Sequence, residues 1–308
     1  MSTFKRITMD DYDTIRKFVS KSKQKSCDYT PANLILWGEV YKTEYCIVDD
    51  MLILKYMGDN KVQFAFPIGD GDKQDAIEWI VSYCETHRIP FCMNKVEPEM
   101  NEWLQENNSE RFHYELDRDS FDYVYKTEDL QKLSGKKYHG KKNHINKFKK
   151  ENPEWSYEAI TADNKEECVQ MVKQWCVENG CCDDKEKAIE VCLVMKAIKN
   201  IERLHMKGGL IRTKQGIVAL TLGEEIDDTT YVIHFEKAFA SVQGAYPMIN
   251  QQFIEHELME YTYVNREDDL GIEGLRRAKE SYHPAFLVEK GRIREKVRAA
   301  KECVAVGQ

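Results

Sequence analysis

The densest group of chemically capable side chains lies in residues 265–284, where acids, bases and amide donors surround one short predicted helix. In such a group, carboxylates accept protons or bind an amine, whereas lysine or tyrosine stabilises an oxyanion or protonates a leaving group. We therefore predict a reacting site in this segment. Its catalytic candidates are Asp268, Glu267, Lys279 and Tyr282, and its substrate-binding candidates are Asn265, Arg266, Asp269 and Arg276.

A purely structural role for the same segment remains open. The helix has a predicted apolar side of Ile272, Leu275, Ala278 and Tyr282. Asp268 and Asp269 would cap it, and ion pairs would link Glu273 with Arg277 and Arg276 with Glu280 at a spacing of four residues. These contacts would pair several of the segment's charged side chains with one another, and those side chains would then not be available to a substrate. Residues 286–288 are expected to form a buried strand.

A second group of interest is the basic segment at residues 132–150, which contains eight lysines and no acid. The whole chain carries a net charge of −8, so the rest of the chain is twice as negative as the whole. Tyr, His, Asn and Phe residues interleave the lysines, which a plain solvated helix does not need. We predict contacts with the phosphates of a donor, such as tRNA or a small phosphate-bearing molecule, from Lys136, Lys137, Lys141, Lys142, Asn143 and Asn146. Ile145 and Phe148 are expected to face the body, and a solvated linker helix is the alternative to phosphate binding.

Two glycine turns precede predicted helices, one at residues 67–72 and one at residues 241–247. Such turns aim backbone N–H groups at phosphate, as in coenzyme A binding. Phe66 and Ser241 occupy the position where a coenzyme A loop usually has Gln or Arg, and Asp70 and Asp72 would repel phosphate. The cofactor-binding candidates are Gly244, Ala245, Tyr246 and Asn250, with a simple helix-starting turn as the alternative.

His234 and Glu236 lie two residues apart in a predicted strand, on the same face if the strand is regular. They would form either an acid–base couple or an ordinary satisfied core histidine. The sequence contains no Ser-His-Asp order, P-loop, dinucleotide fingerprint or metal-ligand spacing, so we expect no metal.

The elements that position these residues occur twice in the same order. Each half of the chain reads as a helix, a three-strand meander, a glycine turn, a helix and a strand. This is the order of the GNAT acyltransferase fold. We therefore predict an α+β protein of two tandem GNAT-like domains, residues 1–130 and 131–308, each a mixed, mostly antiparallel sheet flanked by helices. The second domain includes the basic segment.

Composition narrows the class of protein. With 42% hydrophobic and 32% charged residues in 308, the chain is globular. No apolar run approaches the length of a membrane helix, and the start lacks the apolar core of a signal peptide. The ten cysteines have no C-x-x-C pair, and residues such as Cys84, Cys168, Cys176 and Cys192 fall on apolar faces. We expect buried thiols, no integral membrane segment and a reducing cytoplasm.

Several motifs resemble the bacterial phosphatidylglycerol lysyltransferase C-terminal family, in its soluble, stand-alone branch. The resemblance is carried by residues 121–125, 133–138, 141–148, 244–246, 265–271 and 275–284, and it covers nearly the whole chain. It implies two tandem GNAT-like domains. In the full lysyltransferases an amino acid passes from aminoacyl-tRNA to a lipid head group, and related peptidoglycan aminoacyltransferases share the tRNA donor.

Taken together, these features favour an aminoacyl- or acyltransferase that acylates an amine or hydroxyl, with aminoacyl-tRNA as a possible donor and no certain cofactor. The first alternative is an N-acyltransferase that uses acyl-coenzyme A. The second is a non-catalytic module that binds nucleic acid or a small anion on a degenerate GNAT scaffold.

Overall fold

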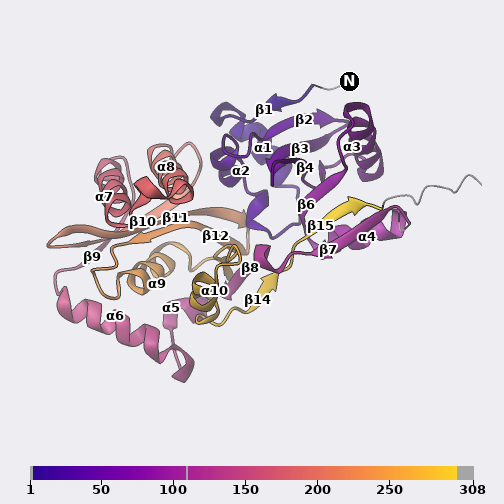
Figure 1. Ribbon diagram of the computed structural model, residues 1–308. Coiled ribbons are helices and arrows are strands. Elements are labelled where there is room, and N and C mark those ends of the chain that lie inside the picture. The colour runs from indigo at the N-terminus through magenta and orange to yellow at the C-terminus, as the bar shows by residue number, and fades with distance from the viewer. Residues whose placement is uncertain (1–2, 109, 297–308) are drawn as a thin grey trace, which may run out of the picture.

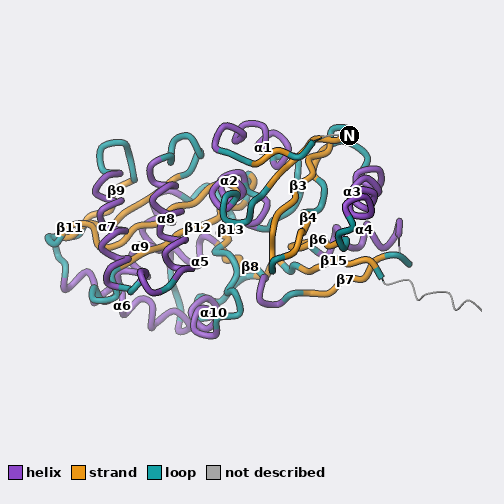
Figure 2. The backbone as a smooth tube through the Cα atoms, turned by 45° about the horizontal axis from the view of Figure 1, so that its top comes forward, coloured by secondary structure: helices purple, strands orange, loops and turns teal. Residues whose placement is uncertain are grey.

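The chain folds around two β-sheets that lie side by side (Figure 1, Figure 2). This computed structural model describes residues 3–108 and 110–296. Each sheet contains an antiparallel meander, then a helix, then a strand that returns parallel to the last meander strand. The predicted α+β architecture is therefore confirmed.

The first sheet has the strand order β1-β2-β3-β4-β6-β15-β7, with β5 paired to β3 beside this path. Its strands are β1 (Lys5–Arg6), β2 (Glu44–Val48), β3 (Met51–Gly58), β4 (Lys61–Phe64), β5 (Ile68–Gly69), β6 (Cys92–Val96), β7 (Phe112–Leu116) and β15 (Gly291–Glu295). Its helices are α1 (Tyr12–Val19), α2 (Pro31–Trp37), α3 (Lys73–His87) and α4 (Pro98–Asn108). Successive side chains of β3 point to opposite faces of the sheet and enter two different hydrophobic cores. Leu52 and Leu54 join the main cluster shared with the second sheet, whereas Ile53 packs with α3.

The second sheet has the order β14-β8-β13-β12-β11-β10-β9. Its strands are β8 (Asp122–Lys126), β9 (Ser156–Ala159), β10 (Lys207–Thr213), β11 (Gly216–Asp227), β12 (Thr230–Ala238), β13 (Tyr263–Asn265) and β14 (Phe286–Val288). Its helices are α5 (Thr127–Lys132), α6 (His139–Glu151), α7 (Lys165–Glu178), α8 (Lys185–Lys199), α9 (Ala245–Glu257) and α10 (Glu273–Glu280). Helices α7 and α8 cover one face, and α9, with α6 packed against it, covers the other (Figure 1). Because both faces are covered, β11 is buried continuously from Ile217 to Glu224.

Two strands cross the domain boundary predicted at residues 130/131. Strand β8 precedes that boundary but pairs with β13 and β14 of the second sheet, and β15 comes from near the end of the chain but completes the first sheet between β6 and β7. A chain cut at that boundary would therefore separate each of these strands from its hydrogen-bonding partners.

A β-bulge interrupts the alternation of side chains along β12. Ile233 lies opposite Gly223 and Phe235 lies opposite Leu222, so His234 is an extra residue between two consecutive positions of β11. As a result His234 reaches Glu224, whereas Glu236 reaches α9 from the opposite face of the sheet. The prediction that His234 and Glu236 share a face was wrong, since a period of two holds only in an unbulged strand.

Helix α10 and strand β14 differ from expectation in their burial. The predicted apolar side of α10 is mostly exposed, with Ile272 at 55% and Leu275 at 36% exposure, and only Tyr282 beyond the helix end is buried. In β14 only Val288 is buried, because the strand lies at the edge of its sheet. Cys192, expected on an apolar face, is exposed on α8.

Candidate functional site

The candidate site lies where the parallel strands β12 and β13 part. Their backbone ladder runs from Thr230 opposite Tyr263 to Val232 opposite Asn265 and then ends. Beyond it, side chains bridge the opening, which we call the split: His234 bonds Glu267 and Glu236 bonds Arg266. Because of the bulge, these two bridges lie on opposite faces of the sheet.

On the α9 side, the Arg266 cluster consists of Arg266, Glu236, Asn250, Tyr282 and Lys141. Arg266 Nη2 donates to Glu236 Oε1 at 3.1 Å, and Asn250 of α9 donates to the other carboxylate oxygen at 3.2 Å. The guanidinium lies 4.7 Å from the ring centre of Tyr282. Lys141 of α6 lies over the same ring at 4.0 Å, so α6 contributes directly to this cluster.

One donor of the Arg266 cluster is left over. Arg266 Nη1 is buried and makes no well-aligned hydrogen bond among the described residues, although the Tyr282 side chain lies near enough to the guanidinium to help raise the pKa of Arg266. Leaving a guanidinium N–H without an acceptor costs free energy, so native structures rarely do so without a reason. An unsatisfied donor beside a carboxylate is suited to receive a ligand oxygen.

Lys279 holds the backbone of the loop that carries Arg266. Its ammonium donates to the carbonyl oxygens of Arg266 and Asp268. Burial lowers the pKa of Lys279, against the opposing effect of Glu267. Lys279 thus ties together the backbone on either side of residue 267.

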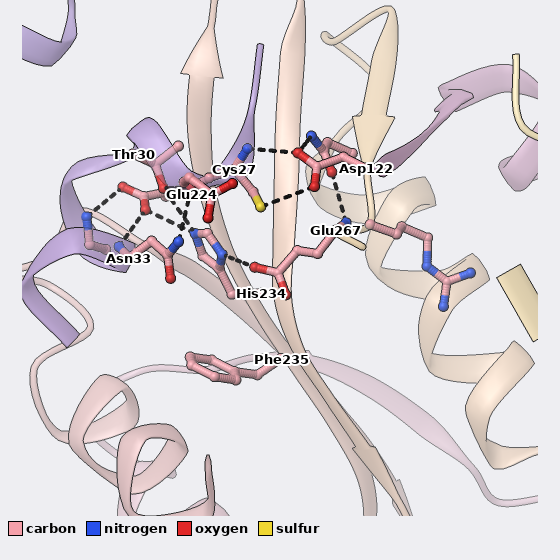
Figure 3. Close-up of polar contacts among 12 residues, drawn as sticks. Cys27, Thr30, Asn33, Asp122, Glu224, His234, Phe235 and Glu267 are labelled. Carbon is pink, nitrogen blue, oxygen red and sulfur yellow. Dashed lines mark hydrogen bonds and ion pairs between the residues drawn. The ribbon is translucent and has the colours of Figure 1, made fainter. Parts of the chain in front are cut away.

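On the other face, the His234 cluster consists of His234, Glu224, Glu267 and Thr30 (Figure 3). His234 Nε2 lies 2.9 Å from Glu224 and Nδ1 lies 2.7 Å from Glu267. Burial alone would lower the pKa of His234, but the hydrogen bonds to the two carboxylates outweigh it and raise that pKa to about 10. The imidazole is therefore a cation at neutral pH, held between two acids.

Glu224 also ties the His234 cluster to the first sheet. Its carboxylate accepts hydrogen bonds from the backbone N–H groups of Ala32 and Asn33 at the start of α2, at 3.0 and 3.1 Å (Figure 3). A carboxylate at a helix N-terminus interacts favourably with the helix dipole. The cluster thus joins the two units.

A buried ion network continues this junction. Lys290 is fully buried and contacts Asp122 at 2.7 Å and Asp28 at 2.6 Å. Asp122 also accepts hydrogen bonds from the Cys27 backbone N–H and from Asn265 Nδ2 (Figure 3). Asn265, predicted to bind substrate, is 0% exposed and is used in this network.

Asp268 and Asp269 leave the loop in different directions. Asp268 pairs with Lys95 of β6 at 3.2 Å, and burial raises its pKa against the opposing effect of Lys95. Asp269 is 0% exposed, receives two hydrogen bonds from Arg276 at 2.7 and 2.8 Å, and accepts one from Tyr123 at 2.6 Å. Asp269 and Arg276, predicted to bind substrate, bond to each other and hold the turn before α10.

Only some of the local contacts expected around α10 are present. Arg277 pairs with Glu273 at 3.5 Å, as predicted. The Arg276–Glu280 pair was wrong, because Arg276 turns to Asp269 and Asp119 while Glu280 lies 3.8 Å from Arg118. No side chain caps the start of α10.

The basic segment forms a separate hollow, which we call the α6 hollow. It has a volume of about 500 Å³ and is lined by Leu133, Ser134, Gly135, Lys136, His139, Lys142, Asn143 and Asn146. Four of the six predicted phosphate-binding residues thus lie together, and no acid lines the hollow. Of the other two, Lys141 belongs to the Arg266 cluster and Lys137 lies 3.9 Å from Asp129. Ile145 and Phe148 face the body, as predicted.

The two glycine turns have packing explanations. A Cβ on Gly244, whose φ is 84°, would lie 2.3 Å from the carbonyl oxygen of His144, because α6 covers the start of α9. A Cβ on Gly71 would lie 1.9 Å from the Asp49 carbonyl oxygen. Among the other cofactor candidates, Ala245 is buried in the core, Asn250 bonds Glu236, and Tyr246 is 38% exposed.

Within the part of the chain that the structure describes, two further observations bear on the site. No group of histidine, cysteine and carboxylate side chains there is arranged to hold a metal ion. None of the helices described is long and apolar enough to cross a membrane.

Comparison with known proteins places this geometry in context. The family model for the C-terminal region of phosphatidylglycerol lysyltransferase matches residues 20–290. A conserved protein of unknown function from Bacteroides thetaiotaomicron is 38% identical, with a TM-score of 0.90 over 96% of this chain and 100% of that one. No curated protein sequence matches the chain.

Two more distant structures show the same fold. L-PGS from Bacillus licheniformis is 14% identical, with a TM-score of 0.62 over 94% of this chain and 93% of that one. A tandem GNAT protein from the clavulanic acid biosynthesis pathway is 8% identical, with a TM-score of 0.52 over 96% and 98% of the two chains. The predicted tandem GNAT-like architecture is thereby confirmed.

Proposed function

The chain belongs to the phosphatidylglycerol lysyltransferase C-terminal family, and we propose that it transfers an aminoacyl group from aminoacyl-tRNA to an amine or hydroxyl acceptor. The family and the similar structures point more generally to an acyl- or aminoacyltransferase. The identity of the donor and the placement of the reacting atoms rest on the geometry described above.

The observation that carries the proposal is the unpartnered Nη1 of Arg266, next to the Glu236 carboxylate. Acyl transfer passes through a tetrahedral intermediate whose oxygen becomes negative, and a fixed donor in a dry site stabilises that charge. Arg266 is held in place by Glu236 and packed against Tyr282, so its free N–H is already oriented. This arrangement fits an oxyanion better than a neutral ground state.

The chemical step needs no covalent enzyme intermediate. The acceptor nitrogen or oxygen forms a bond to the carbonyl carbon of the aminoacyl ester, and the carbon–oxygen bond to the ribose then breaks. Glu236 takes the proton from the acceptor, and that proton returns to the leaving ribose oxygen. Arg266 Nη1 donates to the carbonyl oxygen as it becomes negative, while Tyr282 and Lys141 enclose the site.

The α6 hollow suits the donor's phosphates. Lys136, Lys142 and Asn143 offer donors without a competing acid, which favours a polyanion. Lys141 neighbours Lys142 in sequence and reaches the Arg266 cluster, so α6 links the hollow to the proposed reacting centre. A tRNA 3′ end lying along α6 would bring its ester to Arg266.

Of the four residues predicted to be catalytic, we retain only Tyr282 beside the reacting atoms. Lys279 serves as a positioning residue, through its bonds to the carbonyls of Arg266 and Asp268. Glu267 bonds His234, and Asp268 pairs with Lys95 on the other face. We propose that these two residues set the loop's direction.

Acyl-coenzyme A is the less supported donor. The glycine turn before α9 would have to present its N–H groups to pyrophosphate, but α6 packs directly against Gly244. A role in binding alone would satisfy Arg266 Nη1 equally well, so turnover is what separates it from the proposal. Both alternatives are separated from the proposal by the same experiment.

The test supplies purified protein with total aminoacyl-tRNA carrying labelled amino acids and with a panel of acceptors: ethanolamine, putrescine, glycerol and phosphatidylglycerol. A parallel arm replaces the tRNA with acyl-coenzyme A thioesters. We expect a labelled product, distinct from the free amino acid, only with tRNA, and we expect Arg266→Lys to lose it. The matched control is Lys147→Ala, a change on α6 away from the hollow.

The outcomes are distinct. Consumption of thioesters alone would overturn the tRNA donor. Retention of tRNA binding without turnover on any acceptor would make the chain a binding module. Full activity in Arg266→Lys would show that the reacting centre lies elsewhere.

A further inference from the structure

A second hollow lies in the first sheet, far in sequence from the basic segment. It has a volume of about 190 Å³ and is lined by Asp59, Lys61, Val62, Gln63, Pro90, Phe91, Cys92, Arg292 and Arg294. These residues come from the turn between β3 and β4, from β4, from the start of β6 with the two residues before it, and from β15. Nothing in the proposed transfer reaction uses this hollow.

Its position follows from how the first sheet is paired. Strands β4 and β6 run parallel but meet only at Phe64 opposite Met93, so the start of β4 has no ladder with residues 90–92. Strand β15 pairs antiparallel with β6 and brings Arg294 opposite Cys92. The hollow lies at the starts of β4 and β6, before their single pairing, whereas the split in the second sheet lies beyond the last pairing of β12 with β13.

The lining is strongly cationic for its size. Lys61, Arg292 and Arg294 face a single lining acid, Asp59. Arg292 reaches Asp59 at 3.3 Å, but Asp59 is 71% exposed, and Arg294 lies 3.7 Å from Glu115, which is 64% exposed. Exposed pairs at such distances contribute little and are easily exchanged for another anion.

We propose that this hollow binds the phosphate group of a small phosphorylated molecule. Two guanidinium groups and an ammonium match phosphate oxygens, because arginine offers paired donors and keeps its charge. Phe91, Pro90 and Val62 give the hollow an apolar wall for the rest of such a ligand. The site shares no residue with the proposed reacting centre, and the proposal for it does not depend on the transfer reaction.

Cys92 provides a built-in reporter. Its half-buried thiol lines the hollow. Burial raises the pKa of Cys92, while Arg292, Arg294 and Lys61 act to lower it, which places the sulfur within the field of all three cations. Cys192, exposed on α8, is an internal reference without such a setting.

The test measures alkylation of the whole protein by iodoacetate, an anion, and by iodoacetamide, its neutral analogue, with each cysteine followed by peptide mass spectrometry. Relative to Cys192, Cys92 should favour iodoacetate by about fivefold or more, because the cations attract the anionic reagent. Glycerol 3-phosphate should slow the reaction at Cys92 only, whereas glycerol should not. Inorganic phosphate forms a third arm.

Variants decide whether the cations cause the effect. Arg292→Gln with Arg294→Gln should abolish both the iodoacetate preference and the protection, and Lys61→Gln should reduce them. Lys173→Gln with Lys199→Gln, two exposed changes on α7 and α8, should leave them unchanged. Thermal unfolding of each variant checks that it is folded.

Three results would overturn the proposal: no preference at Cys92, equal protection by glycerol, or protection by inorganic phosphate alone, which would indicate an adventitious ion only. If the thiol reacts with neither reagent, calorimetric titration with glycerol 3-phosphate decides instead. Binding to the wild type that is lost in the double arginine variant supports the site, and no binding to the wild type refutes it.

Discussion

The two faces of the split between β12 and β13 carry similar charges but differ in what those charges leave unsatisfied. On one face the nitrogens of His234 are each bonded to a carboxylate, and Lys290 is enclosed by Asp122 and Asp28. On the other face Arg266 is paired with Glu236 yet keeps a buried N–H without a partner. Buried atoms without a partner also occur at Gln24 and Thr127, so the proposal for Arg266 rests on its spare donor together with the adjacent Glu236 carboxylate.

Under the proposed function, this difference should separate effects on stability from effects on activity. A saturated ion network should matter mostly to folding, because removing one partner leaves another charge buried alone. A group with spare capacity should matter mostly to turnover, because its missing partner is the ligand.

The largest effect is expected for Lys290→Met. This change would leave Asp122, which is 0% exposed, without its cation. Breaking a buried pair in this way costs about 3–5 kcal/mol, and the urea midpoint should fall accordingly. Lys126→Met, at an exposed position of β8, is the matched control and should change the unfolding free energy little. A loss below about 1 kcal/mol would mean that the network is not what joins the sheets.

The next effect concerns the pH dependence of stability. The pKa of His234 is raised from 6.5 to about 10 in the folded protein, so the fold holds this proton more tightly than the unfolded chain does. The resulting stabilisation is complete below about pH 6.5 and is lost as the pH rises towards 10. Over that range the wild type should lose about 2–4 kcal/mol more than His234→Gln, measured by urea unfolding at each pH. Parallel curves for the two proteins would show that His234 is not held as a cation.

The order of elements was predictable from the sequence because it depends on local periodicity. In each half a helix, a three-strand meander, a glycine turn, a helix and a strand follow one another in the predicted order. The sequence brought Lys136, Lys142 and Asn143 together as phosphate-binding candidates, and they line one hollow, whereas Lys141 from the same set turns to Tyr282. The assignment of these residues to phosphate stays a prediction.

The site itself was less predictable, for two physical reasons. The single extra residue in the bulge at His234 changes which face of the sheet the neighbouring side chains of β12 point to. The alternation of apolar and polar residues in the sequence does not reveal such an inserted residue. The partners of Lys290 lie 168 and 262 residues away, so nothing in its neighbourhood distinguishes it from a surface lysine. Tertiary pairing, rather than local pattern, decides which charges are saturated.

The activity of Arg266→Lys tests the opposite face. Lysine keeps a cation for Glu236 but lacks the second guanidinium nitrogen that is free to bind a ligand oxygen. Turnover should fall about 100-fold, equivalent to about 2.7 kcal/mol, while the unfolding free energy changes by less than about 1 kcal/mol. Loss of stability without loss of turnover would show that Arg266 supports the fold and takes no part in the reaction.

The smallest effect is expected for the α6 hollow, whose contacts are exposed and screened by salt. Replacing Lys136 and Lys142 with alanine removes two cations that line it, whereas replacing Lys147 and Lys150 removes two cations of α6 that do not line it. The dependence of log K for tRNA on log salt should become shallower by about 1–2 units in the first double variant. Both variants lose the same net charge, so a general electrostatic attraction would weaken them equally. If phosphates bind in the hollow, the salt dependence should fall more in the Lys136/Lys142 variant than in the Lys147/Lys150 variant. Equal slopes in the two variants would indicate that the basic segment is a solvated helix.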